Sequence, residues 1–311
     1  HLAYLCEIAR PTVSAVLNVG TAHVGEFGSR ANIARAKSEI VAALPSAADG
    51  GVAVLTADDD AVRAMSALTP AEVVLVGRAA DADLRAIDVR LDDAARPSFT
   101  VVAGTEQVPV VLPLHGVHHV ANALTVLAVA RACGVDLAEA AARLRDAVPE
   151  SRWRMEVSTT PGGVTVVNDA YNANPESMRA ALRTLATLGR SSGRRTWAVL
   201  GEMLELGDAR VREHTLVGES VVRLNIAQLL VVGAGARPLY IGALNEGSWG
   251  EEAHFVDDAA QAEAFLAEHL RPGDLVLVKS SNGVGLAALG ERLATADAVA
   301  APSASPKESR P

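Results

Sequence analysis

Apolar residues follow two different spacings along this chain, and the change between them divides it into two parts. In the first part, Thr12 to Val19 is an apolar run typical of a strand buried on both faces of a parallel sheet, and Ser29 then begins a helical pattern. Between Val73 and Leu112, short alternating segments such as VVLVG, IDVRLD and VPVVLPL are typical of antiparallel strands and hairpins. The pattern therefore predicts a mixed sheet with helices.

From Met155 onward, apolar strand-like runs alternate regularly with helical patterns. TWAVLG, QLLVV and DLVLVKS are separated by helices expected around Val211 to Leu224 and Ala259 to Leu270. Such alternation predicts an α/β fold with a doubly wound, mainly parallel sheet. After about residue 296 the chain is rich in Ala, Ser and Pro, without apolar periodicity, which predicts disorder. We predict domains at residues 1–153 and 154–296, followed by a disordered tail at 297–311.

Composition narrows the classes of function. The 311 residues are 50% hydrophobic and carry a formal charge of -9 without a run of Lys or Arg, which argues against a nucleic-acid or anionic-membrane partner. No apolar stretch is long enough to span a membrane and no signal peptide opens the chain, so we expect a cytoplasmic protein without membrane insertion. We also predict a monomer. Cys6 and Cys133 lie in apolar helical patterns, where we expect both to pack as small hydrophobic side chains.

The densest set of polar side chains follows the predicted strand at Val164 to Val167. Asn174 is a good N-cap for the next helix and Pro175 suits its first turn, so the polar residues Asp169, Tyr171, Asn172 and Asn174 should lie where a strand ends and a helix begins. In open α/β sheets ligands bind at that edge, and a carboxylate there can hold a cation or a ribose hydroxyl. The alternative is a capped turn with solvated polar side chains.

Other patterns are weaker when taken alone. His23 follows a predicted strand, but a single histidine there is more often a satisfied polar group than a metal ligand. His118 and His119 are adjacent, so one metal ion held by both and by His115 is not expected. Gly233-Ala-Gly235 follows a strand but lacks the third glycine of a dinucleotide site.

Several stretches together resemble the Mur ligase family. The first is NDAYNANPESM, and the second is N-V-G-x-A-H-x-x-x-F-G-S followed by I-A-x-A-K-x-E-I. R-M-E-V, L-G-E-M-x-E-L-G with a following histidine, and a lysine-serine motif at Lys279 match in the same order, up to about residue 295. The resemblance implies the rear part of a central ATPase domain followed by a Rossmann-like C-terminal domain.

The resemblance also assigns residues to the first domain. It implies that His23 is a Mg²⁺ ligand and that Lys37 is carbamylated, which would replace a repelling ammonium by the oxygen donors that Mg²⁺ prefers. The alternative is that Lys37 is a solvated helix residue paired with an acid such as Glu39. Asn122 matches the asparagine that contacts adenine, whereas His119 and Thr56 stand where the family has asparagine.

In the second domain, the resemblance implies that Arg154 holds a phosphate and that Asp169, Tyr171 and Asn172 bind the nucleotide. An ion pair is the alternative for Arg154, and solvated loop carboxylates are the alternative for Glu202 and Glu205. The candidate substrate contacts are Asn174, Glu202, Glu205, Lys279, Ser281 and Asn282. Ser280 replaces the glycine and Asn282 the arginine of the family motif, so this chain has no cationic side chain at the arginine position.

The implied activity is an ATP- and Mg²⁺-dependent amide ligase that joins D-alanyl-D-alanine to UDP-N-acetylmuramoyl-tripeptide through an acyl phosphate. No Gly-rich phosphate loop with a lysine occurs in these residues, and the chain opens on His1 inside a helical pattern that Pro11 ends. We therefore expect a fragment that is inactive alone, with the phosphate loop upstream. A non-catalytic nucleotide-binding protein of the same fold and, less favoured, an NAD-dependent oxidoreductase using Gly233 and Gly235 stay open as alternatives.

Overall fold

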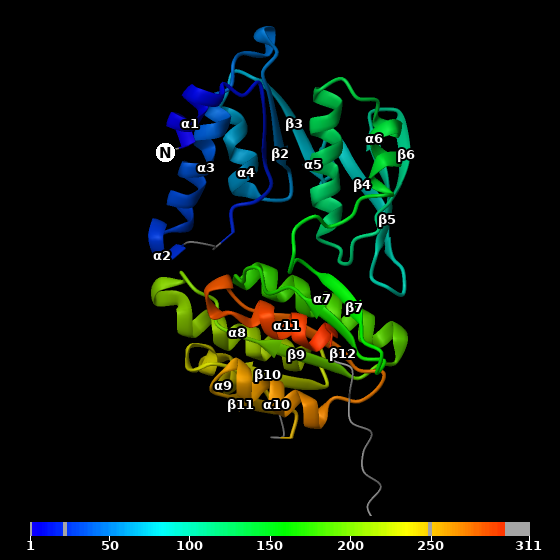
Figure 1. Cartoon of the computed structure of the whole chain (residues 1–311). Helices are drawn as coiled ribbons and strands as arrows, with labels where there is room; N and C mark the ends of the chain where they lie inside the picture. The colour runs from blue at the N-terminus through cyan, green and yellow to red at the C-terminus, as the bar shows by residue number, and fades with distance from the viewer. Residues whose placement is uncertain (1, 21–23, 248–250, 296–311) are drawn as a thin grey trace, which may run out of the picture. The chain divides into compact units, whose positions relative to one another are not determined.

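The computed structural model describes residues 2–20, 24–247 and 251–295 and divides the chain into two compact units (Figure 1). The first unit contains residues 1–150 together with the short segment 205–209, and the second contains residues 151–204 and 210–311. His23 and the predicted tail at 297–311 lie outside the described residues.

The first unit is built on one six-stranded sheet in the order β1-β2-β3-β4-β5-β6. Strands β1 to β4 pair in parallel, so the antiparallel prediction is wrong for VVLVG, which is β3 and pairs in parallel with both of its neighbours. The prediction holds for β4, β5 and β6, which pair as antiparallel hairpins. Its strands are β1 (Val13–Val16), β2 (Val52–Thr56), β3 (Glu72–Gly77), β4 (Leu84–Leu91), β5 (Pro97–Ala103) and β6 (Glu106–Val111). Its helices are α1 (Leu2–Ala9), α2 (Val24–Phe27), α3 (Arg30–Ala42), α4 (Asp60–Arg63), α5 (His119–Ala132) and α6 (Leu137–Leu144).

Alternation along the strands gives this sheet a core on each face. Val54 of β2 packs with α5 and α6, whereas its neighbours Ala53 and Leu55 pack with α3 and α4. Ser29 caps α3 as predicted, because its side chain accepts the Asn32 N–H at 3.1 Å. Cys6 of α1 is buried as expected, but Cys133 is exposed at the end of α5, so the expectation that it packs as a hydrophobic side chain is wrong.

The second unit contains a second six-stranded sheet, in the order β11-β10-β9-β12-β8-β7, in which only the edge strand β7 is antiparallel. Its strands are β7 (Glu156–Thr159), β8 (Thr165–Asn168), β9 (Thr196–Leu200), β10 (Gln228–Val232), β11 (Ala253–Val256) and β12 (Leu275–Lys279). Its helices are α7 (Pro175–Ser192), α8 (Arg210–Arg223), α9 (Arg237–Glu246), α10 (Ala259–His269) and α11 (Leu286–Thr295). The predicted doubly wound α/β fold is confirmed.

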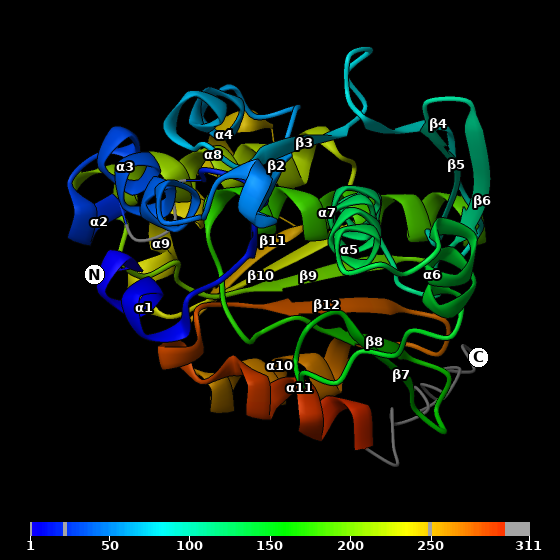
Figure 2. The same ribbon diagram turned by 90° about the horizontal axis from the view of Figure 1, so that it is seen from above.

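Helices cover both faces of this sheet. Figure 2 shows α10 and α11 on one face and α7 and α8 on the other. Trp197 and Val199 of β9 and Val276 of β12 pack with the α10 and α11 side. Every residue of β9 and β12 is buried, as parallel strands covered on both faces require. No helix among the described residues has the length and apolar character to cross a membrane.

Candidate functional site

Three loops that carry sequence motifs leave the second sheet at the same edge. β8, β12 and β9 are neighbours, and Val278 lies beside Asn168 while Lys279 lies beside Leu200. The parallel register therefore places the chain ends of these three strands at one level. The loops after β8, β9 and β12 leave from this point, where open α/β sheets bind their ligands.

Lys279 and Asp169 form the centre of this edge. The Lys279 Nζ donates to Asp169 Oδ2 at 2.6 Å, to the Asn172 carbonyl at 2.9 Å and to the Asp169 carbonyl at 3.3 Å. Lys279 is only 2% exposed, and these bonds match the three donors of an ammonium group. Lys279 therefore holds the loop after β8 through two carbonyl groups of that loop as well as through the Asp169 carboxylate.

The second carboxylate oxygen of Asp169 binds the segment at the start of the second unit, just before β7. Asp169 Oδ1 accepts the Met155 N–H at 3.0 Å, and the Trp153 carbonyl accepts the Tyr171 N–H at 3.0 Å. Between these two anchors, the Arg154 guanidinium carbon lies 4.0 Å above the centre of the Tyr171 ring. This is a cation–π stack, and it holds an exposed positive charge beside the Asp169 loop.

Ser281 joins all three loops. Its hydroxyl donates to the Ala173 carbonyl at 3.2 Å and accepts the Leu204 N–H at 2.9 Å, while its own N–H donates to the Glu202 carbonyl at 3.0 Å. Ser281 is 4% exposed, so its hydroxyl is buried and forms its hydrogen bonds within the protein. Asn282, the next residue, is exposed.

His214 of α8 fixes the loop after β9. Its Nε2 accepts the Met203 N–H at 2.9 Å and its Nδ1 lies 2.7 Å from the Arg210 carbonyl. A backbone N–H can only donate and a carbonyl can only accept, so these partners assign a neutral imidazole with its proton on Nδ1. Burial lowers the pKa of His214 below its ordinary value, which favours this neutral form.

Glu202 lies in the same loop and occupies the Gly-x-Gly turn after β10. A Cβ added to Gly235 would lie 1.8 Å from Glu202 Oε2, and Glu202 Oε1 accepts from Arg210 Nη1 at 2.9 Å. A carboxylate at this position repels the phosphates that a dinucleotide would place against the turn. The geometry therefore counts against the alternative of an NAD-dependent oxidoreductase.

Asn174 caps α7 in a reciprocal arrangement. Its Oδ1 accepts the Ser177 N–H at 2.8 Å, and Ser177 Oγ accepts the Asn174 N–H at 3.0 Å. Pro175 opens the helix, as the sequence predicts, and Glu176 lies in its first turn. Asn172, by contrast, is exposed, and its side-chain oxygen accepts the neighbouring Ala173 N–H at 2.8 Å.

In the first unit, Lys37 of α3 reaches the end of β1. Its Nζ donates to the Asn18 carbonyl at 2.7 Å. Burial lowers the pKa of Lys37, and the nearby Asp59 carboxylate partly opposes that shift. Asp59 also caps α4 and accepts the Val19 N–H at 2.8 Å, so it fixes the loop that Lys37 touches.

Asn122 lies in the first turn of α5, on an exposed position of the first unit. Thr56, at the end of β2, has a buried hydroxyl that finds no hydrogen-bond partner among the described residues. The rings of His118 and His119 are 4.1 Å apart. Within the described part of the chain, no three His, Cys, Asp or Glu side chains gather as a metal site.

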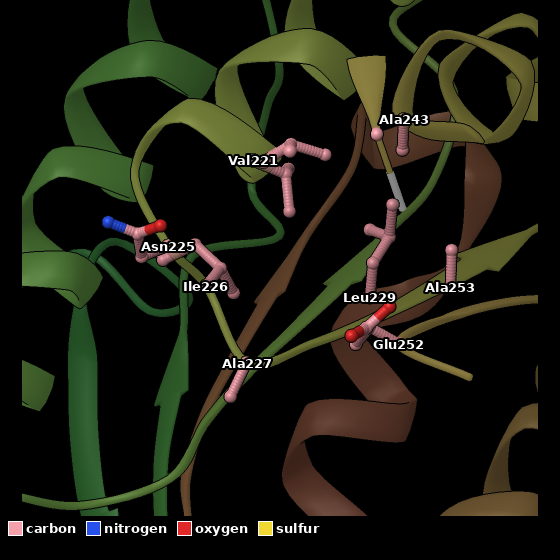
Figure 3. A pocket seen from close by; sticks show the side chains of 10 residues that line it. Val221, Asn225, Ile226, Ala227, Leu229, Ala243, Glu252 and Ala253 are labelled. Atoms are coloured by element: carbon pink, nitrogen blue, oxygen red, sulfur yellow. The ribbon is translucent and has the colours of Figure 1, made fainter. Parts of the chain in front are cut away.

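A separate pocket of about 320 Å³ lies in the second unit, where β10 and β11 begin (Figure 3). Apolar side chains such as Val221, Ile226 and Leu229 line it, with Asn225 and Glu252 as its polar members. The pocket is thus at the opposite end of the strands from the three motif loops.

Two family models match the chain in succession. The Mur ligase middle domain matches residues 1–130, and the glutamate ligase domain of Mur ligases matches residues 153–282. The chain belongs to the Mur ligase family.

This Mur ligase chain is similar to proteins of one activity within the family. It is 47% identical over 312 residues to the UDP-N-acetylmuramoyl-tripeptide–D-alanyl-D-alanine ligase of Mycobacterium tuberculosis (strain ATCC 25618 / H37Rv), which covers 96% of the chain and 61% of that protein. The chain thus spans about 61% of the length of that relative.

Solved structures give the same result. A crystal structure of MurF from Acinetobacter baumannii superposes with a TM-score of 0.82 at 29% identity and covers 94% of the chain and 62% of that protein. MurF ligase from Thermotoga maritima, in complex with ADP, superposes with a TM-score of 0.77 at 25% identity and covers 94% and 64%.

The Mur ligase structure brings most predicted residues of the second domain together. Arg154, Asp169, Tyr171, Asn172, Asn174, Glu202, Lys279, Ser281 and Asn282 all lie on or beside the three loops. Glu205 instead belongs to the segment that packs with the first unit, where its carbonyl accepts the Gly25 N–H at 2.9 Å.

Sequence reasoning missed one residue with several contacts at this edge. Glu291 of α11 accepts the Trp153 indole N–H at 2.9 Å on Oε1 and forms an ion pair with Arg152 through the same oxygen. Glu291 is 138 positions from Trp153, and no motif marks it. A helix position with an acidic side chain carries no local signal for such a contact.

Proposed function

We propose that this Mur ligase chain serves the ATP-dependent joining of D-alanyl-D-alanine to UDP-N-acetylmuramoyl-tripeptide. The relatives named for that reaction support the substrates. The single structural observation that carries the proposal is the Lys279, Asp169 and Arg154 arrangement at the strand ends. It places a fixed carboxylate and an exposed cation together, next to the capped start of α7.

The residues of this edge fit a nucleotide. Asp169 keeps a side chain that is 14% exposed, and each carboxylate oxygen has a second lone pair free to accept a ribose hydroxyl beyond its bonds to Met155 and Lys279. Arg154 can donate two parallel hydrogen bonds to a phosphate while Tyr171 holds its plane. Tyr171 and Asn172, both exposed, complete the proposed nucleotide-binding set of this edge. In the first unit, Asn122 is exposed and its amide offers the donor and the acceptor that suit an adenine. The ADP in the Thermotoga relative supports a nucleotide in this family.

The residues of the first unit fit Mg²⁺ if Lys37 is carbamylated. Among the described residues, no ready-made group of three metal ligands exists, but Mg²⁺ commonly binds through one or two carboxylates and the phosphates of its nucleotide. The lowered pKa of Lys37 increases its neutral amine fraction, which is the form that adds CO₂. Carbamylated Lys37 and His23 would then hold Mg²⁺, which when bound neutralises charge on the transferring phosphate.

The proposed reaction needs the protein to orient the transferred phosphate of ATP, the carboxylate of the tripeptide and the amine of the dipeptide. A phosphate leaves ATP for the tripeptide carboxylate, and the dipeptide amine then displaces it to form the amide. Arg154 would hold the phosphate, while Glu202, Glu205, Asn174, Ser281, Asn282 and Lys279 are the proposed set around the substrates. Of these, Lys279 and Ser281 are buried and fully bonded, so we propose that they act by holding the loops.

A non-catalytic nucleotide-binding protein of the same fold is the second candidate. It would use the same Asp169 and Arg154 edge but would release no ADP. Phosphate transfer therefore separates the two, and the experiment is ADP release by the chain extended upstream to include a phosphate loop, with UDP-muramoyl-tripeptide and with or without the dipeptide. Release that depends on the dipeptide supports the ligase, and binding without release supports the second candidate.

A labelling experiment tests the role of Lys37 separately. The extended protein is equilibrated with ¹³C-bicarbonate, and the carbamate carbon is observed by NMR. We expect one carbamate signal that is absent in Lys37→Arg. A spectrum unchanged by that substitution would contradict carbamylation of Lys37.

A further inference from the structure

The segment that carries Arg154 has an unusual backbone. Trp153 has φ 59° and Met155 has φ 52°, so a left-handed residue lies on each side of Arg154 and neither is glycine. Residues other than glycine rarely adopt this backbone conformation, and it persists only where surrounding contacts hold it. The contacts around this segment therefore decide where Arg154 points.

One group of these contacts comes from the loop after β8. The Tyr171 N–H donates to the Trp153 carbonyl, and the Met155 N–H donates to Asp169, both at 3.0 Å. These bonds fix the two ends of the turn but leave the Trp153 side chain and Arg152 to be held by something else.

That second anchor is Glu291. One oxygen of Glu291 accepts from the Trp153 indole and pairs with Arg152, whose guanidinium carbon lies 5.4 Å from the centre of the Trp153 ring. The Trp153 ring also packs against the core cluster beneath α10 and α11. Glu291 thus binds Arg152 and Trp153, the two residues that precede Arg154.

Glu291 can act as an anchor because α11 is itself fixed. The helix packs along β8 (Figure 2), and the buried Asn168 side chain donates to the Ala287 carbonyl at 3.0 Å. Gly290 allows this approach, since a Cβ there would lie 2.4 Å from Asn168 Nδ2. A continuous set of contacts therefore leads from the motif residue Asn168 through α11 to the Arg154 turn.

We propose that Glu291 is a positioning residue that aims Arg154 over Tyr171 and so sets the affinity for the nucleotide phosphates without touching them. The inference rests on the proposed function of Arg154. Its sharpest consequence is that Glu291 acts only through Arg154, so its removal should matter little once Arg154 is gone.

The test is a double-mutant cycle in the extended protein. The dissociation constant for Mg²⁺ with a non-hydrolysable ATP analogue is measured by calorimetry for the parent, Glu291→Ala, Arg154→Ala and the double variant. We expect Glu291→Ala to weaken binding by about tenfold in the parent and by less than about twofold in the Arg154→Ala background. Glu291→Gln keeps an acceptor for the indole but loses the ion pair, and should give an intermediate loss.

Glu263→Ala is the matched control, because it removes an ion pair of the same kind, 2.7 Å long, between α10 and Arg292 of α11. It should leave nucleotide affinity unchanged. Equal losses from Glu291→Ala in both backgrounds, no loss in the parent, or no effect of Arg154→Ala would each overturn the inference. A parent that binds the analogue but releases no ADP with the dipeptide contradicts the ligase function, while the cycle still decides the role of Glu291. A parent that binds no analogue overturns both.

Discussion

Lys279 donates to Asp169 across 2.6 Å while its side chain is only 3% exposed. Two motif residues that are 110 positions apart in sequence are therefore one structural pair, and the lysine has no donor left for a substrate. The ammonium holds the carboxylate in place, and the carboxylate in turn holds the Met155 N–H. The protein's own side chains therefore hold this edge of the sheet together.

Removing the lysine alone should be costly, because it leaves a carboxylate that is mostly buried without its counter-charge. We expect Lys279→Met to lower the free energy of unfolding of the second unit by about 3 kcal/mol. Every tryptophan of the sequence follows residue 150 and none falls in the segment 205–209, so tryptophan emission during urea unfolding reports on the second unit. The double variant Lys279→Met with Asp169→Asn should recover part of the loss, and a double variant as unstable as the sum of both single ones would contradict the pairing.

The His214 contact predicts a dependence of stability on pH. Its pKa is lowered in the folded state, so the unfolded chain binds more protons once the pH falls below the ordinary value of 6.5. The stabilisation is therefore complete above pH 6.5 and is lost as the pH falls towards the folded pKa. His254, whose pKa burial and His269 lower, acts in the same direction.

The His214 part can be isolated by substitution. His214→Gln should reduce the loss of stability between pH 7 and pH 5 relative to the parent. At pH 7, His214→Ala should destabilise the second unit by about 1–3 kcal/mol, because it leaves the buried Met203 N–H unpaired. Urea unfolding at several pH values measures both, and identical pH profiles for parent and His214→Gln would contradict the neutral-imidazole assignment.

Gly235 gives a way to move Glu202 without replacing it. Alanine at this position would place a Cβ 1.8 Å from Glu202 Oε2, so the carboxylate must move and lose its contact with Arg210. If Glu202 contacts the dipeptide, Gly235→Ala in the extended protein should raise the KM for D-alanyl-D-alanine by about tenfold, like Glu202→Gln, and leave the KM for ATP unchanged. In a Glu202→Ala background the Gly235→Ala change should have no further effect. An equal rise in both backgrounds would show that the glycine matters for another reason.

Asn174 is both a helix cap and a proposed substrate contact, and two substitutions separate these roles. Asn174→Ala should lower the stability of the second unit by about 1 kcal/mol through loss of the cap, whereas Asn174→Ser should restore it. If capping is the whole role, serine also restores the rate of ADP release. A stable serine variant with a low rate would instead support a substrate contact.

Much of this fold follows from local rules that the sequence displays. Asn174 and Ser29 cap their helices as predicted, and the alternation after Met155 corresponds to a parallel sheet covered on both faces. The apolar strands could be predicted because a buried parallel strand leaves a continuous hydrophobic run. Cys133 shows the limit of this reasoning, because an apolar helix pattern does not say which of its last positions faces solvent.

The site was predictable only in part, because its geometry depends on contacts between distant segments. The motifs identified Asp169, Lys279 and Ser281. They did not show that the side chains of Lys279 and Ser281 form hydrogen bonds within the protein. Glu291 could not be found, since its partners, Arg152 and Trp153, lie at the other end of the second unit in sequence. Glu202 filling the Gly235 turn is likewise a packing fact that neither motif contains.

ADP release tests the central claim most directly. It is measured for this chain and for a version extended upstream to include a phosphate loop, each with ATP, Mg²⁺ and UDP-muramoyl-tripeptide, and with or without D-alanyl-D-alanine. We predict that only the extended chain releases ADP and that release requires the dipeptide. An extended chain that releases ADP at the same rate without the dipeptide, or that releases none with it, would contradict the ligase function.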